Sequence, residues 1–174
     1  MALAILFAPQ IVNVGFIVGG SGGRAVLIAR DRNGRWSDPA FYALATGSIG
    51  FLAGPKVAEA APLVQTGEAF ESLLSTSMRF GADATIAAGL AGTGATPDMV
   101  TDLVSFSRSK KRYGDLTLDG AVVSLSADWS AANYGKPASA SASEILIRRR
   151  MVNQKSSRLL RMAVFGLGAW RLDR

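Results

Sequence analysis

The sequence contains neither histidine nor cysteine, and each absence excludes a class of chemistry. Histidine is the usual general base near neutral pH, so neither Ser-His-Asp nor Cys-His catalysis can operate. Zinc sites of the Cys/His kind and disulfide bonds cannot form either. No D-x-D-x-D-G calcium loop occurs, although a magnesium or calcium site made of carboxylates alone stays open. We therefore predict a protein that is not an enzyme and carries no cofactor.

Charge is also scarce, since charged residues make up 18% of the chain and hydrophobic residues 49%. This balance is typical of a globular protein, and 174 residues suit one domain. The apolar runs at residues 1–8 and 162–170 are too short to cross a bilayer, so we predict no transmembrane span. Residues 2–7 read as a core strand with no helix before it, and we expect that an upstream segment has been missed or removed.

The charges are unevenly distributed along the chain. Residues 1–147 contain 11 basic and 12 acidic residues, whereas residues 148–174 contain eight basic residues and one acidic residue. The net charge of +6 therefore comes from the C-terminal end. We predict a nearly neutral domain over 1–147 and a basic, helical tail over 148–174.

Turn-forming residues divide the first half of the chain into short elements. The glycine cluster Gly19–Gly23 predicts a loose hairpin tip, and Asn33-Gly34 predicts a tight turn. Strands are expected around these turns over residues 3–7, 14–18, 24–30 and 40–52.

The second half mixes helical and extended patterns. A helix is predicted over 66–78, with Thr66 as its N-cap, whereas residues 55–65 suit either a strand or a helix. Residues 144–170 have helical character with a break near Val152. Further strands are expected over 79–90, 100–109 and 116–126, the last two paired through a basic turn.

Two glycine-rich segments, 19–23 and 89–94, could suggest a phosphate-binding loop. Neither matches G-x-x-x-x-G-K-[ST] or G-x-G-x-x-G, so ordinary turn chemistry is the better interpretation. Asp83, among small apolar residues, is interpreted as a buried hydrogen-bond hub or a cap, with ligand binding as the alternative.

A cluster of basic residues precedes Tyr113, and it has two interpretations. It could be a solvated hairpin tip, or a loop that contacts lipid headgroups, because lysine and arginine both suit phosphate. The cluster consists of Arg108, Lys110, Lys111 and Arg112.

The tail carries an apolar stripe at helical spacing. A basic amphipathic helix is typical of a membrane surface or a partner groove, although a terminal helix docked on the body would show the same pattern. The stripe consists of Leu159, Leu160, Ala163, Val164, Leu167 and Trp170. The basic residues outside it that we expect to matter most are Arg148, Arg149, Arg150, Lys155, Arg158 and Arg161.

Several segments, in the same order and with compatible spacing, resemble the SYLF domain family. They are Gly15–Gly20, Gly34–Phe41, Thr46–Gly50, Phe80–Gly89, Ser105–Lys110, Leu118–Ala121 and Tyr134-Gly135. The resemblance implies an α+β fold whose glycine-rich, largely antiparallel sheet is barrel-like and flanked by helices. It also implies binding to membranes or phosphoinositide-type lipids. Eukaryotic relatives are associated with actin binding, and bacterial relatives are often exported or lipid-anchored.

Two features depart from the family pattern. The N-terminal amphipathic segment that often contributes to lipid binding is not in this chain, and Ala53-Gly54-Pro55-Lys56 replaces the familiar Gly-Ala-Gln. Arg108 and Lys110 match the family's Ser-Arg-Ser-Lys element.

The sequence therefore predicts a non-enzymatic module that binds anionic or phosphoinositide-type membrane lipid through two basic patches, Arg108–Arg112 and the arginine-rich tail. The alternative is a protein-interaction module that binds actin-like filaments or cell-envelope partners. A nucleic-acid role is not favoured, because no reader motif is present. The resemblance favours the cell envelope or periplasm, whereas the visible N-terminus, if genuine, favours the cytoplasm.

Overall fold

A computed structural model of the chain describes residues 2–15, 18–49, 56–88, 101–109, 118–135 and 141–150. Within these residues, one eight-stranded sheet has the strand order β5-β8-β3-β2-β1-β4-β7-β6. Its strands are β1 (Ala4–Gly15), β2 (Val18–Ala29), β3 (Ala40–Ile49), β4 (Lys56–Val64), β5 (Ser77–Arg79), β6 (Ile86–Ala88), β7 (Leu103–Ser109) and β8 (Val122–Leu125). The helices are α1 (Gly67–Leu74), α2 (Ala127–Tyr134) and α3 (Ala142–Leu146).

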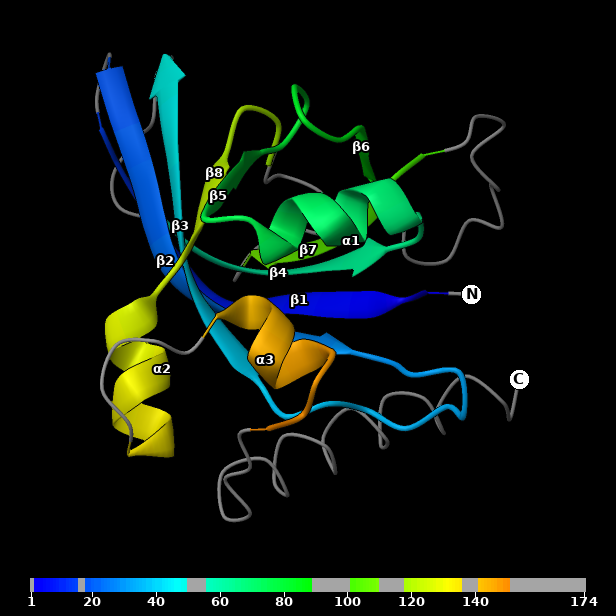
Figure 1. Ribbon diagram of the computed structural model, residues 1–174. Coiled ribbons are helices and arrows are strands. Elements are labelled where there is room, and N and C mark those ends of the chain that lie inside the picture. Colours follow the sequence, from blue (N-terminus) through cyan, green and yellow to red (C-terminus); the bar gives the residue numbers. More distant parts are fainter. Residues whose placement is uncertain are drawn as a thin grey trace, which may run out of the picture.

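The sheet is curled but open, like half of a barrel (Figure 1). All pairings are antiparallel except that of β6 with β7, so the sheet is mixed, with β5 and β6 at its edges. Helices α1 and α3 lie inside the curve, whereas α2 lies outside it beside β3. The predicted barrel-like, largely antiparallel α+β fold is thus confirmed in outline, with less helix than the prediction implied.

The core fills the inside of the curve. Alternate residues of the long strands point inward and are buried, and they meet the apolar sides of α1 and α3. Tyr42 of β3 joins two of these elements, because its hydroxyl donates to the carbonyl oxygen of Leu73 in α1 at 2.6 Å. Burial raises the pKa of Tyr42, so this hydroxyl stays protonated and remains a donor.

The predicted helix over 66–78 forms, but it is shorter. Thr66 caps it as expected by accepting from the backbone N–H of Ala69 at 3.3 Å. The helix ends at Leu74, and Ser77–Arg79 instead form the edge strand β5 against β8. The ambiguous residues 55–65 include the strand β4, which pairs on both sides with β1 and β7.

The glycine cluster is not a hairpin tip, as the sequence suggested, but part of β2. Residues Gly19–Gly23 pair with β1 on one side and β3 on the other. At Gly23 the neighbouring strand comes so close that an added Cβ would lie 2.5 Å from the carbonyl oxygen of Gln10, where the register of β1 shifts. Glycine is therefore required here by a close backbone approach at a β-bulge and not by a turn.

The prediction of a strand pair formed by residues 100–109 and 116–126 is also wrong. Both segments contain strands, but β7 pairs with β4 and β6, whereas β8 pairs with β3 and β5. Sequence proximity favoured a hairpin, but the curl of the sheet carries the two strands to different sides of it. The predicted hairpin is therefore not formed, and Lys110, Lys111 and Arg112 of the basic cluster lie outside the described residues.

The C-terminal part of the described chain differs from the prediction in two ways. Helix α2 was not expected, because its sequence has no clear apolar stripe. Helix α3 ends at Leu146, earlier than the break predicted near Val152. The predicted tail helix beyond Arg150 lies outside the described residues, and the domain boundary at residue 147 stays a prediction.

Candidate interaction surface

The turn between β2 and β3 forms the first part of the candidate surface. The backbone N–H of Gly34 donates to the carbonyl oxygen of Asp31 at 3.0 Å, and that of Arg35 donates to Asp31 Oδ1 at 2.8 Å. Gly34 has φ 79°, which confirms the tight turn predicted from Asn33-Gly34. Because these hydrogen bonds all lie within residues 31–35, the turn has a defined backbone conformation and fixes where its side chains begin.

Arg30 adds to the turn from its β2 side. Its Nε donates to the carbonyl oxygen of Gly34 at 3.2 Å, and its guanidinium lies 5.9 Å from the centre of the Trp36 ring. A cation–π contact at this distance is weak and positions the side chain more than it stabilises the fold.

The segment after α3 forms the second part of the surface. Helix α3 is anchored in the core by Ile145 and Leu146, and the chain beyond it turns sharply at Arg149, which has φ 50°. Arg149 Nη2 donates to the carbonyl oxygen of Arg35 at 3.0 Å and lies 3.1 Å from Asp31 Oδ2. This side chain therefore attaches the end of the described chain to the β2–β3 turn.

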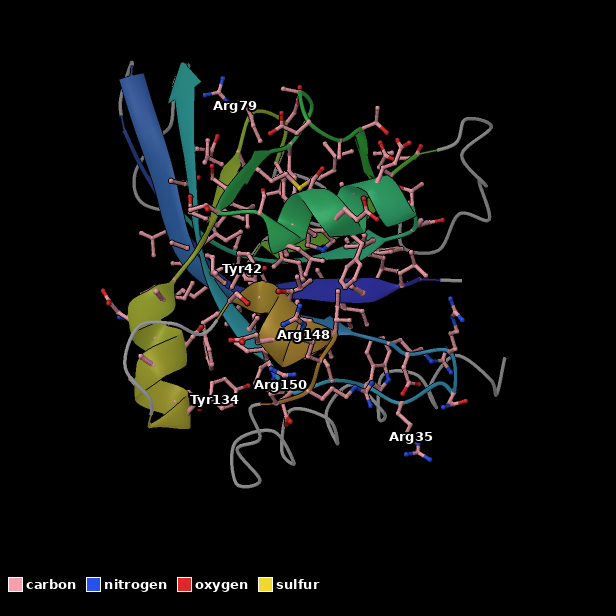
Figure 2. The ribbon with its side chains drawn as sticks, in the orientation of Figure 1. Arg35, Tyr42, Arg79, Tyr134, Arg148 and Arg150 are labelled. Atoms are coloured by element: carbon pink, nitrogen blue, oxygen red, sulfur yellow. The ribbon has the colours of Figure 1, made fainter. Side chains whose placement is uncertain are left out.

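Together the two segments bring six arginines to one end of the sheet, and we call this set the arginine surface. It consists of Arg30, Arg32, Arg35, Arg148, Arg149 and Arg150. Arg32, Arg35, Arg148 and Arg150 are exposed, and Figure 2 shows Arg35, Arg148 and Arg150 at the lower side of the molecule, below Tyr42. Ile147, which is 55% exposed, adds an apolar contact next to Arg148.

Asp31 is the carboxylate that organises the arginine surface. The backbone N–H of Arg35 holds the pKa of Asp31 below its usual value, and the charge of Arg149 acts in the same direction. Asp31 therefore remains ionised at neutral pH and keeps Arg149 in place. Arg149 and Asp31 remain 32% and 30% exposed, so the pair is accessible to salt.

The structure places the predicted site residues in two separate regions. Arg148, Arg149 and Arg150 lie in the arginine surface, while Lys155, Arg158 and Arg161 are outside the described residues. Arg108 lies near the far end of β7, and Lys110, Lys111 and Arg112 follow outside the described part. The register from β7 through β4 and β1 to β2 puts the Leu103 end of β7, not the Ser109 end, level with Ala29 and the turn. At about 3.3 Å per residue, Arg108 is some 15–20 Å from that level.

Sequence reasoning missed Arg30, Arg32 and Arg35. Arg30 was assigned to the strand 24–30, Arg32 to the turn and Arg35 to the family segment Gly34–Phe41, although three arginines within six residues are themselves a signal of a charged surface. What the sequence did not contain was the contact of this turn with Arg149, which is separated from Arg35 by more than a hundred residues.

A second feature is an open groove of about 610 Å³ between α1 and β5. Its lining combines carboxylates with serines: Glu68, Glu71, Ser72, Ser75, Ser77 and Asp83. Asp83 is exposed and accepts from the backbone N–H of Arg79 at 2.6 Å, so it caps a turn and is not the buried hub that we considered. The lining thus offers carboxylate and hydroxyl oxygens.

The described residues contain neither a cluster of metal ligands nor a helical membrane span. No group of three or more acidic, histidine or cysteine residues there could hold a metal ion. No described helix is both long and apolar enough to span a bilayer.

Comparisons with known proteins point to one family. Residues 45–164 match the family model Ysc84, described as "Las17-binding protein actin regulator", which confirms the SYLF resemblance. The curated relatives in Saccharomyces cerevisiae include LAS seventeen-binding protein 3, 24% identical over 120 residues, and Protein YSC84, 23% identical over 120 residues. Each alignment covers 65% of this chain and 26% of the relative, so the chain spans about a quarter of those proteins.

Proposed function

This chain belongs to the Ysc84 family of Las17-binding actin regulators, and we propose that it is a non-enzymatic protein-interaction module that binds an acidic partner of the actin-filament type. The family description and the printed name of LAS seventeen-binding protein 3 both denote binding and not a reaction. The observation that carries the proposal is the arginine surface: the Asp31–Arg149 contact joins the turn that carries exposed Arg32 and Arg35 to the segment that carries exposed Arg148 and Arg150.

The chemistry of the arginine surface suits a protein partner. Arginine and tryptophan are enriched where protein interfaces bind most tightly, since each combines an apolar body with polar donors. Here half-buried Trp36 and exposed Ile147 lie among the arginines. The guanidinium groups of Arg148 and Arg150 can each bind a carboxylate in bidentate fashion. An acidic protein segment therefore fits this surface, because its carboxylates match the arginines both in charge and in hydrogen-bonding geometry.

Anionic lipid is a second candidate, supported by the same exposed end of the chain. An apolar residue beside arginines, as Ile147 is beside Arg148, is a pattern that also suits the interface of an anionic membrane. Of the second predicted lipid patch, Arg108 lies near the Ser109 end of β7, away from the arginine surface, whereas Lys110, Lys111 and Arg112 are outside the described residues.

The test is co-sedimentation of the whole chain, in parallel, with actin filaments, with vesicles containing phosphatidylserine and with neutral vesicles. The informative variant is Arg148→Glu combined with Arg150→Glu. The matched control is Arg79→Glu, because Arg79 is also exposed but lies on the opposite side of the molecule (Figure 2). Reversing two charges on the binding surface should weaken binding by about tenfold or more.

The proposal expects filament binding that the double variant loses and the Arg79→Glu variant retains. Binding to phosphatidylserine vesicles alone would replace the protein partner with a lipid. Filament binding that is equally weak in the double variant and in the control would remove the arginine surface from the function.

A further inference from the structure

The last four described residues, 147–150, have a fixed backbone, and we call them the tip. The backbone N–H groups of its first two residues both donate to the carbonyl oxygen of Ser143 at 3.0 Å. The N–H of its last residue, Arg150, donates to the carbonyl oxygen of Glu144 at 3.1 Å. Both acceptors lie in α3, whose buried residues belong to the core cluster, so these hydrogen bonds attach the tip to the body of the protein.

Arg149 fixes the tip from a second side. Its φ of 50° lies in the left-handed region, which a residue other than glycine keeps only when its surroundings impose that conformation. Its side chain supplies the restraint, because it bonds to the carbonyl oxygen of Arg35 and pairs with Asp31. The other three residues of the tip are exposed. The tip therefore presents three side chains from a backbone that is held both by α3 and by the β2–β3 turn.

Ile147 is the apolar member of this exposed set. It is 55% exposed, more than any other large apolar side chain in the described part of the chain, whereas Leu146 before it is buried. An exposed apolar residue on a mobile segment would need no explanation, since the segment could turn it away from water. The hydrogen bonds of the tip prevent such a movement. Ile147 thus forms an apolar centre next to Arg148 and two residues from the N–H of Arg149.

We propose that Ile147 is the apolar anchor of the arginine surface and selects a protein partner that offers an apolar pocket bordered by carboxylates. This inference rests on the proposed function and specifies the chemistry of the partner. Protein interfaces combine an apolar centre with a polar rim, and the exposed Arg148 and Arg150 supply the rim here. A fixed tip loses little conformational freedom on binding, so burial of Ile147 adds to the affinity without a large ordering cost.

The anchor and the arginines contribute in different ways. The arginines alone would bind any acidic surface, with an affinity that salt screens. The apolar contact of Ile147 is not screened, so it distinguishes an acidic partner with a matching pocket from a partner that has charge alone. Measuring the binding at several salt concentrations therefore separates the two contributions.

The experiment is co-sedimentation of the whole chain with actin filaments at several salt concentrations, comparing the unaltered chain with Ile147→Thr. Threonine keeps the branched Cβ and removes most of the apolar contact. We expect about fivefold weaker binding at every salt concentration, with the same dependence on salt as the unaltered chain. Ile147→Leu keeps the apolar volume and should bind nearly as well as the unaltered chain.

Val12→Thr is the matched control, because Val12 is also branched, apolar and exposed, at 37%. The other end of β1 lies near the β2–β3 turn, since Ala4 pairs with Ala29. Val12 is about 26 Å along the strand from Ala4, at about 3.3 Å per residue. Filament binding by Val12→Thr should equal that of the unaltered chain. The melting temperatures of both threonine variants should change little, because neither residue belongs to the core cluster.

Equal filament binding by Ile147→Thr and the unaltered chain would overturn the inference and leave the proposed function standing. A loss in Ile147→Thr that disappears at high salt would also overturn it, because the contact would then be electrostatic. If only phosphatidylserine vesicles bind, and Ile147→Thr weakens that binding, Ile147 inserts into a membrane and a protein pocket is ruled out. No binding of the unaltered chain to filaments would overturn the proposed function, and the inference with it.

Discussion

Asp102 and Asp31 each connect segments that are distant in the sequence, but they do so with different partners. Asp102 accepts from the Thr66 hydroxyl at 2.6 Å, and from the Thr85 backbone N–H at 2.9 Å and hydroxyl at 2.8 Å, all neutral groups. Asp31 instead combines a backbone N–H with the charged Arg149. The first contact joins the start of α1 to β7 and the segment before β6, whereas the second joins the two halves of the arginine surface.

This difference separates a contact that maintains the fold from one that shapes a surface. Neutral hydrogen bonds to a carboxylate are little affected by salt, and they persist while the carboxylate is ionised and the segments stay together. An ion pair exposed to solvent contributes little stability and is screened by salt. The two aspartates should therefore respond differently to mutation, acid and ionic strength.

The largest effect is expected for Asp102→Ala. Removing this carboxylate breaks three hydrogen bonds to a charged acceptor, which should lower the free energy of unfolding by about 2 kcal/mol. Urea denaturation should show a lower midpoint with an unchanged slope. Asp83→Ala is the control, because Asp83 caps a single exposed turn. Equal losses in both variants would mean that Asp102 is not a junction of the fold.

Lowering the pH should remove the stabilising contributions of both Asp102 and Asp31. The Thr66 hydroxyl, followed by the Thr85 N–H, lowers the pKa of Asp102, and the Arg35 N–H lowers the pKa of Asp31. A carboxylate with a lowered folded-state pKa stabilises the protein fully above its ordinary pKa of about 3.9, and this stability is lost as pH falls through the lowered value.

The free energy of unfolding should thus be nearly constant from neutral pH to about pH 5 and then decrease. In Asp102→Asn the decrease should be shallower, because one of the titrating groups is gone. A denaturation series across pH checks this, and an identical acid limb in the variant would contradict the stated cause.

The smallest effect on stability is expected for Arg149→Met. It removes an exposed charged contact, so the melting temperature should change little, and any change should vanish at high salt. The effect should appear instead in partner binding, because Arg148 and Arg150 lose their defined position. Measuring both the melting temperature and the co-sedimentation of the same variant separates its effect on stability from its effect on partner binding. A large loss of stability that persists at high salt would make Arg149 part of the fold.

The local chemistry of several elements could be read from the sequence. Thr66 was recognised as a helix cap and Asn33-Gly34 as a turn, because each depends on side-chain or backbone properties of a few neighbouring residues. The family resemblance extended this to the curled sheet. The glycine cluster failed as a predictor because glycine serves both turns and close strand approaches, and only the neighbouring Gln10 distinguishes the two.

The candidate site was also predictable only in part, because the sequence shows its charges but not which distant segments meet. The basic character of Arg148–Arg150 was visible as a run of charge, and so was the basic stretch after Arg108. The contact of the β2–β3 turn with Arg149 and the position of Arg108 near the far end of β7 both depend on the strand order of the sheet.

The sequence by itself determined the absence of histidine and cysteine chemistry, the basic C-terminal end, the capped helix and the family. The tertiary structure decided that β7 and β8 separate, that Gly19–Gly23 lie in a strand and that Arg30, Arg32 and Arg35 join the arginines after α3. The reason is physical. Composition, caps and turns depend on groups close together in the chain, whereas strand order and the meeting of Arg149 with Asp31 depend on which distant segments the curled sheet brings into contact.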